Sequence, residues 1–90
     1  FATMKIAVWD TYVTRKDGKV MHFDILVDEK LKDEKVIFDY GKNYLKSIMQ
    51  EGQPLTSKEC NFCHIDKASE EVEQQILNSG FAIIEMENCY

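Results

Sequence analysis

The sequence predicts an α+β fold, a two-layer sandwich in which a mixed four-stranded sheet carries both helices on one face. Apolar residues alternate with a period of two near the N-terminus, as in strands, and follow a helical period of about 3.6 in two later segments. The 90 residues suffice for one modest core, so we expect a single domain over residues 4–90 in the order ββαβαβ. Residues 1–3 precede Met4 and look like a cloning remnant.

Residues 4–13 and 20–27 form the first two predicted strands, joined as a hairpin. Both segments are rich in β-branched and aromatic residues, and Asp17-Gly18 suits the turn between them because both residues tolerate positive φ. If Gly18 lies in a bulged three-residue loop, the strand register brings the apolar side chains of both strands to one core face. That face would comprise Ala7, Trp9, Met21, Phe23, Ile25 and Val27.

The same register would group four side chains on the other face of the hairpin: Asp10, Tyr12, His22 and Asp24. Cross-strand neighbours on one face come within about 5 Å, so an Asp-His pair there could act as a general base or bind a small ligand. The four residues could equally be the polar side of a two-layer sheet. A two-residue loop would turn the side chains of one strand to the opposite face relative to the other strand, so the sequence leaves this grouping open.

Residues 33–51 predict the first helix, with Asp33 as N-cap and Gly52 followed by Pro54 as the stop. Gly41 lies within its apolar stripe, where glycine costs about 1 kcal/mol relative to alanine. We therefore expect the helix to approach the sheet closely at Gly41.

The second half of the chain predicts strand, helix, strand. The third strand contains residues 59–66, Ser69 caps a helix over residues 70–79 that Gly80 ends, and residues 81–86 form the fourth strand. Helical crossovers between parallel strands are right-handed, and the helix packs back on the sheet. We therefore expect both helices on the same face.

Composition excludes several classes of partner. The net charge of −5 and pI near 4.9, with dispersed basic residues, argue against nucleic acid, which is bound through clustered Lys and Arg. The sequence has no run of about 18 apolar residues, so we expect no membrane span and a cytoplasmic address. Three cysteines in that compartment favour free thiols or metal ligands over a disulfide framework.

Cys60-x-x-Cys63-His64 is the densest group of reactive side chains. This spacing attaches haem in c-type cytochromes, but the segment looks like a strand and we expect no export leader, so covalent haem is disfavoured. A redox pair is also disfavoured, because Cys60 lies far from the helix cap Ser69 and strand alternation turns the two thiols to opposite faces.

Zinc is the alternative, with a tetrahedral site formed by Cys60, Cys63, His64 and Cys89, or with His22 as a substitute ligand. The chain has no second Cys-x-x-Cys pair, and a bulge or tight turn at Asn61-Phe62 would be needed to bring these ligands together. The simpler interpretation is that the cysteines are small buried residues packed under the helices.

Several spaced motifs carry a resemblance: Trp9-Asp10-Thr11-Tyr12-Val13, Asp17-Gly18, Met21-His22-Phe23-Asp24, Cys60-x-Phe62-Cys63-His64 and Met86-Glu87-x-Cys89. Together they resemble a family of small bacterial proteins described as domain of unknown function DUF2024. The resemblance covers the chain from Met4 onward. It implies a compact α/β domain with this order of elements, and it implies no activity, substrate or cofactor.

We therefore expect a binding or interaction module rather than an enzyme, with no cofactor. An apolar patch on an uncovered sheet face would favour a homodimer, and it would consist of Ile6, Val8, Tyr12 and Leu26. The alternatives are the zinc domain and a small enzyme that uses an Asp-His pair on the open face. The sequence does not specify a protein partner.

Overall fold

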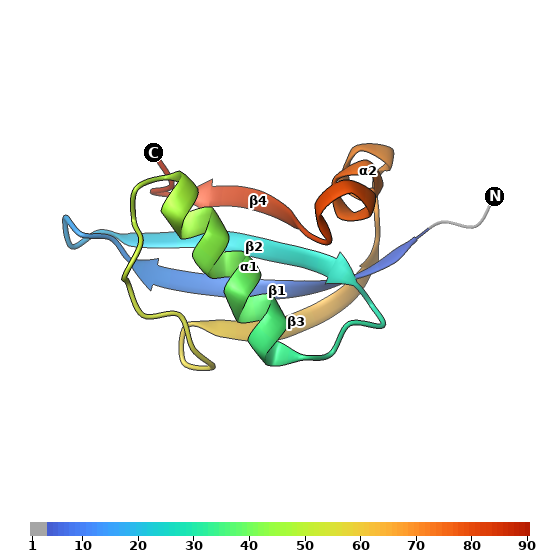
Figure 1. The fold of residues 1–90 in the computed structure, drawn as a ribbon, viewed down its shortest axis with the longest axis horizontal. Coiled ribbons are helices and arrows are strands. Elements are labelled where there is room, and N and C mark those ends of the chain that lie inside the picture. Colours follow the sequence, from blue (N-terminus) through green and yellow to red (C-terminus); the bar gives the residue numbers. More distant parts are fainter. Residues whose placement is uncertain (1–3) are drawn as a thin grey trace.

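The structure is a computed structural model that describes residues 4–90, and the predicted remnant at residues 1–3 lies outside them. The elements are β1 Lys5–Thr14, β2 Val20–Asp28, α1 Glu34–Ser47, β3 Cys60–Lys67, α2 Glu70–Ser79 and β4 Ala82–Glu87 (Figure 1). The α+β class and the order ββαβαβ are confirmed. Within residues 4–90, no helix is long and apolar enough to cross a membrane.

The sheet is antiparallel throughout, not mixed as predicted, and its strand order is β3-β1-β2-β4. Figure 1 shows β3 and β4 at the two edges, with β1 and β2 between them. The prediction assumed that each helix joins parallel neighbours. Instead α1 links β2 to β3 past β1, and α2 links β3 to β4 past both central strands, so neither crossover joins adjacent strands.

The β1–β2 hairpin adopts the bulged register. Arg15 N–H donates to Lys19 O at 2.7 Å and Gly18 N–H donates to Arg15 O at 3.0 Å, which leaves a three-residue loop with Gly18 at φ 90°. Tyr12 pairs with His22, and Asp10 pairs with Asp24. The predicted division of side chains between the two sheet faces is therefore confirmed.

Helix α1 packs on one face of the sheet, called here the α1 face. Asp33 caps it by accepting from Lys35 N–H at 3.0 Å, as predicted. A Cβ at Gly41 would lie 2.5 Å from Leu55 Cδ1, so glycine permits the predicted close approach. The α1 face buries the main core, which includes Trp9, Val13, Met21, Phe23, Ile25, Val27, Ile37, Leu45, Leu55, Cys60 and Cys89.

Helix α1 ends at Ser47, before the predicted stop at Gly52. The reason is local: Met49 adopts φ 62°, and Gln50 N–H donates to Leu45 O at 2.8 Å, which closes the helix end.

Helix α2 packs on the opposite face, called here the α2 face, whereas the sequence predicted both helices on one face. Val72 and Ile76 pack with Val8, while Trp9 packs in the α1-face core. Neighbouring strand residues point to opposite faces, so the two helices must lie on opposite sides of the sheet. Ser69 and Gly80 cap α2 as predicted.

Candidate functional site

The Asp10–His22–Asp24 cluster lies on the α2 face, on the two central strands. The distance from His22 Nε2 to Asp10 Oδ1 is 3.8 Å, and the distance to Asp24 Oδ1 is 3.7 Å. One ligand atom from each of the three side chains lies within 4.8 Å of the others. No other group of three or more potential metal ligands converges this closely within residues 4–90.

Hairpin register brings the cluster together. Asp10 on β1 lies directly opposite Asp24 on β2, and His22 lies two positions before Asp24 on the same face. Tyr12 pairs with His22, and their rings stack at a centroid distance of 4.2 Å and an interplanar angle of 11°. Tyr12 is half exposed, and its stacked ring covers one face of the imidazole.

Two atoms of the cluster are buried without a hydrogen-bond partner in the described residues: His22 Nε2 and Asp24 Oδ1. Their separation of 3.7 Å is too long for a hydrogen bond. Asp24 is only 9% exposed. Buried polar atoms without partners are uncommon in folded proteins, and this pair therefore requires an explanation.

Desolvation raises the pKa of Asp24 from 3.8 to about 6, and the neighbouring Asp10 carboxyl raises it further. The charges of His22 and His64 act in the opposite direction. Two carboxyl groups directly opposite each other repel when both are ionised. The cluster therefore favours positive charge.

Cys63 and His64 join this side of the molecule through a β-bulge. Val8 pairs with His64 and Trp9 pairs with Phe62, which leaves Cys63 as the extra residue of β3. His64 Nδ1 lies 3.2 Å from Cys63 Sγ. The pKa of the exposed Cys63 thiol is raised by partial desolvation and by the nearby carboxylates of Asp10 and Asp24.

The structure does not bring together the four residues predicted as zinc ligands. Cys60 and Cys89 are buried in the α1-face core, Cys60 on β3 and Cys89 beyond the end of β4, at opposite edges of the sheet. Thr11 Oγ1 donates to Cys60 Sγ at 3.3 Å, and burial is the main cause that raises the pKa of Cys60. Only Cys63 and His64 of the predicted set are neighbours.

The predicted open apolar patch is largely covered by α2. Ile6, Val8 and Leu26 are buried in the second core cluster, together with Val72 and Ile76. Tyr12 remains exposed, and Val20 and Ile84 are also exposed on this face. The homodimer through this face stays a prediction, with a smaller apolar surface than the sequence suggested.

A pocket of about 270 Å³ lies between the cluster and α2. Its polar lining includes Asp24, His64 and Asp66, and its remaining lining residues are Ile6, Val8, Leu26, Lys67, Ser69, Val72 and Ile84. His64 Nε2 lies 3.6 Å from Asp66 Oδ2. The cluster therefore borders a small concave site whose charged lining residues are Asp24, Asp66 and Lys67.

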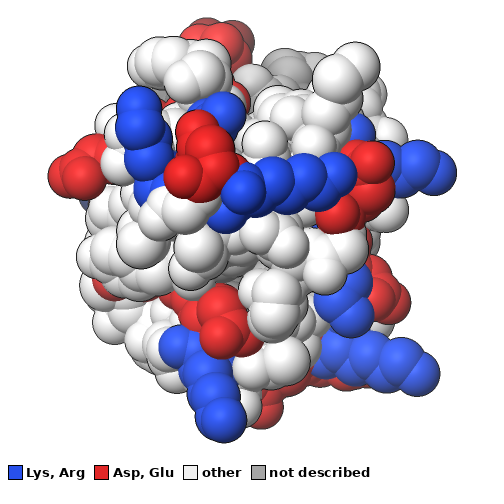
Figure 2. Space-filling view, turned by 90° about the vertical axis from the view of Figure 1, so that its left-hand side faces the viewer, with Lys and Arg blue, Asp and Glu red and all other residues white. Residues whose placement is uncertain are grey.

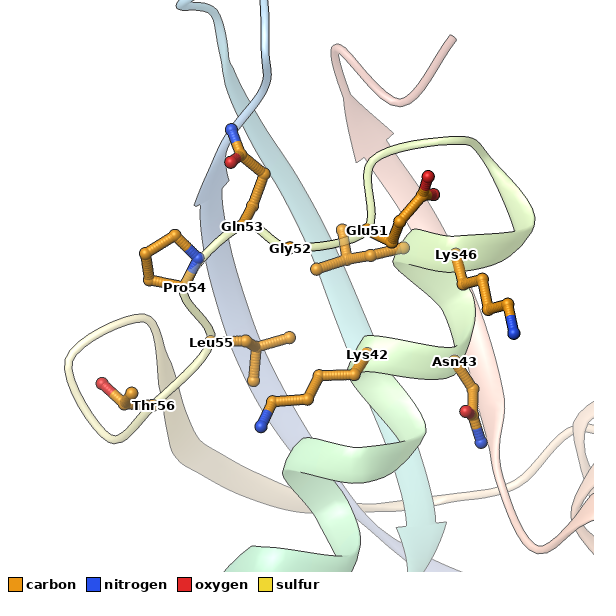
Figure 3. A pocket seen from close by; sticks show the side chains of 10 residues that line it. Lys42, Asn43, Lys46, Glu51, Gly52, Gln53, Pro54, Leu55 and Thr56 are labelled. Carbon is orange, nitrogen blue, oxygen red and sulfur yellow. The ribbon is translucent and has the colours of Figure 1, made fainter.

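A wider groove of about 540 Å³ lies between α1 and the loop at residues 51–56 (Figure 3). Figure 3 shows Leu55 pointing toward α1, while the charged ends of Lys42, Lys46 and Glu51 point in different directions. The hairpin end of the molecule likewise carries charges of both signs, interleaved rather than gathered (Figure 2). Neither surface presents the convergent polar groups of the cluster.

Comparisons with known proteins agree with the fold. The profile of a family described as domain of unknown function, DUF2024, matches residues 4–86. The chain belongs to this family. The NMR structure of protein NE1680 from Nitrosomonas europaea is similar, with a TM-score of 0.84 and 46% sequence identity over 97% of this chain and 100% of that chain. No significant match was found among curated proteins.

Membership of DUF2024 confirms the resemblance seen in the sequence, and the family description names no activity. Chemical inference for this DUF2024 domain therefore depends on the cluster. The sequence predicted that Asp10, His22 and Asp24 share one sheet face, which the structure shows, but it did not predict that Cys63 and His64 lie near them. One signal was present in the sequence: the Cys-x-x-Cys-His segment needs a bulge to bring its potential ligands together. Nothing local indicated that this strand pairs with β1.

Proposed function

We propose that this DUF2024 domain is a non-catalytic binding module that holds a small cationic ligand at the Asp10–His22–Asp24 cluster. The observation that carries the proposal is the buried pair His22 Nε2 and Asp24 Oδ1, 3.7 Å apart and without hydrogen-bond partners in the described residues. A cation between them would satisfy both atoms, provided that the imidazole is neutral.

Charge and shape support a small cation. Asp10 and Asp24 face each other within the cluster, and the adjoining pocket is lined by one further carboxylate, Asp66, beside Lys67, so carboxylates outnumber basic side chains around the site. The pocket volume of about 270 Å³ lies just below the range of about 300–1,000 Å³ that is typical of sites for drug-sized molecules. The ligand is therefore expected to be an ion or a very small organic cation.

The thiols favour binding over cysteine catalysis. A cysteine nucleophile requires a lowered pKa, usually from a helix N-terminus or a neighbouring cation. Here desolvation raises the pKa of both Cys60 and Cys63, and neighbouring carboxylates raise it further. Both thiols are therefore mainly protonated at neutral pH.

The test is a titration of isotope-labelled protein followed by amide and histidine NMR signals. The probes are divalent metal ions, methylammonium and guanidinium. Saturable shifts should centre on His22 and Asp24, and Asp24→Asn should weaken binding at least about tenfold, because it removes a buried charged partner. The control, Asp39→Asn, makes the same charge change on the exposed surface of α1 and should bind normally. If no probe shifts these signals, the proposal is wrong.

A further inference from the structure

The candidate cation site consists of three side chains of different chemistry on two paired strands. Building on the proposed function, we propose that the ligand is a divalent transition-metal ion coordinated by Asp10, His22 and Asp24. This site is distinct from the cysteine-histidine set suggested by the sequence, because two of those cysteines are buried on the opposite face.

The distances are close to those of a coordination sphere. A zinc ion with ligand bonds of about 2 Å in tetrahedral geometry separates its ligand atoms by about 3.3 Å. The two His-Asp separations are 3.8 and 3.7 Å, and all three atoms lie within 4.8 Å of one another. Contraction by a small side-chain rotation is feasible, since Asp10 is partly exposed and not enclosed by the core.

An independent observation supports the site beyond the collection of ligand-type residues. Asp24 is 9% exposed, and its Oδ1 has no hydrogen-bond partner within residues 4–90. The buried His22 Nε2 faces it and is also unpartnered. These are the two atoms that a metal ion would bind, and coordination would satisfy both of them.

The supporting structure is rigid. Asp10 lies on β1, while His22 and Asp24 lie on β2, and the β1–β2 ladder is continuous in register from Ile6–Asp28 to Thr14–Val20. Tyr12 stacks on the imidazole of His22 and holds its plane. Ligands held on paired central strands keep their geometry better than ligands on loops.

The ligand types select the class of metal. Neutral imidazole with two carboxylates suits Zn²⁺, Co²⁺ and similar ions, whereas Ca²⁺ requires six to eight oxygen ligands and Mg²⁺ prefers oxygen ligands in octahedral geometry. Three protein ligands leave at least one position open for water. We therefore expect Zn²⁺ and Co²⁺ to bind and Mg²⁺ to bind much more weakly.

The experiment is calorimetric titration of the chelator-treated 90-residue protein with Zn²⁺, Co²⁺ and Mg²⁺, together with the visible absorption of the Co²⁺ form. We expect one Zn²⁺ per chain and a shift of the His22 side-chain nitrogen signal. His22→Gln, Asp24→Asn and Asp10→Asn should each weaken Zn²⁺ binding by more than about tenfold. Amide spectra establish that each variant is folded, and the partly exposed Asp10 provides a test even if a buried variant does not fold.

Two controls locate the ion. Asp39→Asn should retain Zn²⁺ affinity, and the double variant Cys63→Ser/His64→Gln tests whether the ion lies at the β3 bulge instead, in which case this variant and not His22→Gln would lose it. If the double variant loses Zn²⁺ while His22→Gln retains it, the ion lies at the bulge and the inference is overturned. If methylammonium or guanidinium binds at the cluster but no metal ion does, the metal inference fails and the proposed function stands. If none of the probes binds there, both fail.

Discussion

His22 Nε2 and Asp24 Oδ1 face each other at 3.7 Å on the same strand, and neither atom has a hydrogen-bond partner in the described residues. The two residues are separated by one position, so strand alternation places them on one face whatever the remainder of the fold does. Asp10 joins them through the hairpin ladder. The cluster therefore depends on local structure, and single substitutions can test it without changing the topology.

Asp24→Asn should stabilise the metal-free protein at neutral pH. Folding raises the pKa of Asp24 from 3.8 to about 6. The contribution of Asp24 to the free energy of unfolding is therefore fully present below pH 3.8, where the carboxyl is protonated in both states, and it is lost as the carboxyl of the folded protein ionises near pH 6. Asparagine resembles the protonated acid and avoids that loss. We expect a gain of about 1–2 kcal/mol at pH 7.5 after allowance for solvent screening, and little gain near pH 4.

The measurement is urea unfolding of both proteins from pH 4 to pH 8. Comparison with the wild type isolates the contribution of Asp24 from those of other titrating groups. Asp39→Asn serves as the exposed control and should show a difference that is small and nearly independent of pH. A gain from Asp24→Asn that is equal at all pH values would contradict the assignment of the raised pKa.

One thiol of the three should react readily in the native protein. Cys63 is exposed, whereas Cys60 and Cys89 are buried in the α1-face core. With an aromatic disulfide reagent we expect one fast equivalent from the native protein, three from the unfolded chain, and no fast equivalent from native Cys63→Ser. The pH midpoint of the fast reaction should lie above 9.0, because desolvation and the neighbouring carboxylates raise the pKa of Cys63. Two or three fast equivalents from native protein would contradict the structure.

Part of the site could be predicted because it depends on a single hairpin. Asp17-Gly18 indicated the turn, and the alternation from Met21 to Val27 set the faces, so the grouping of Asp10 with Asp24 followed from one loop length. Cys63 and His64 could not be placed in the same way. Their position depends on the pairing of β3 with β1 and on a bulge, both of which result from long-range packing.

The location of α2 was also beyond the reach of local patterns. Val72 and Ile76 give the helix an apolar side but do not show which sheet face it covers. The sequence alone predicts an exposed patch that includes Ile6, Val8 and Leu26, but these residues are the surface that α2 buries. An apolar stretch on a strand indicates burial, and only the topology shows whether a helix of the same chain or a second molecule provides the cover.

Gly41→Ala should destabilise the protein, although alanine has the higher helix propensity. A Cβ at this position would lie 2.5 Å from Leu55 Cδ1 and 2.9 Å from Ile25 Cδ1, and both side chains are buried. Overpacking of this kind costs about 1–3 kcal/mol, whereas the gain in propensity is about 1 kcal/mol. We expect a net loss of about 1 kcal/mol in the free energy of unfolding, measured by urea denaturation.

Two comparisons identify the cause. Asn43→Ala changes an exposed position of α1 and should gain a few tenths of a kcal/mol from propensity alone. In a Leu55→Ala background the nearer of the two obstructing side chains is removed and only the Ile25 contact remains, so Gly41→Ala should be clearly less destabilising there. If Gly41→Ala remains destabilising to the same extent in that background, the contact with Leu55 is not its cause.

Met49→Gly should stabilise the end of α1. Met49 has φ 62° and is 79% exposed, so its side chain gives little burial in return for a left-handed backbone. That conformation costs a non-glycine residue about 1–2 kcal/mol, and glycine adds about 0.5–1 kcal/mol of unfolded-state entropy, which leaves a net gain of about 0.5–1 kcal/mol. Thermal or urea unfolding measures it. Met49→Ala retains a Cβ and should gain nothing, so an equal gain from both variants would show that loss of the exposed methionine, and not relief of the backbone, is responsible.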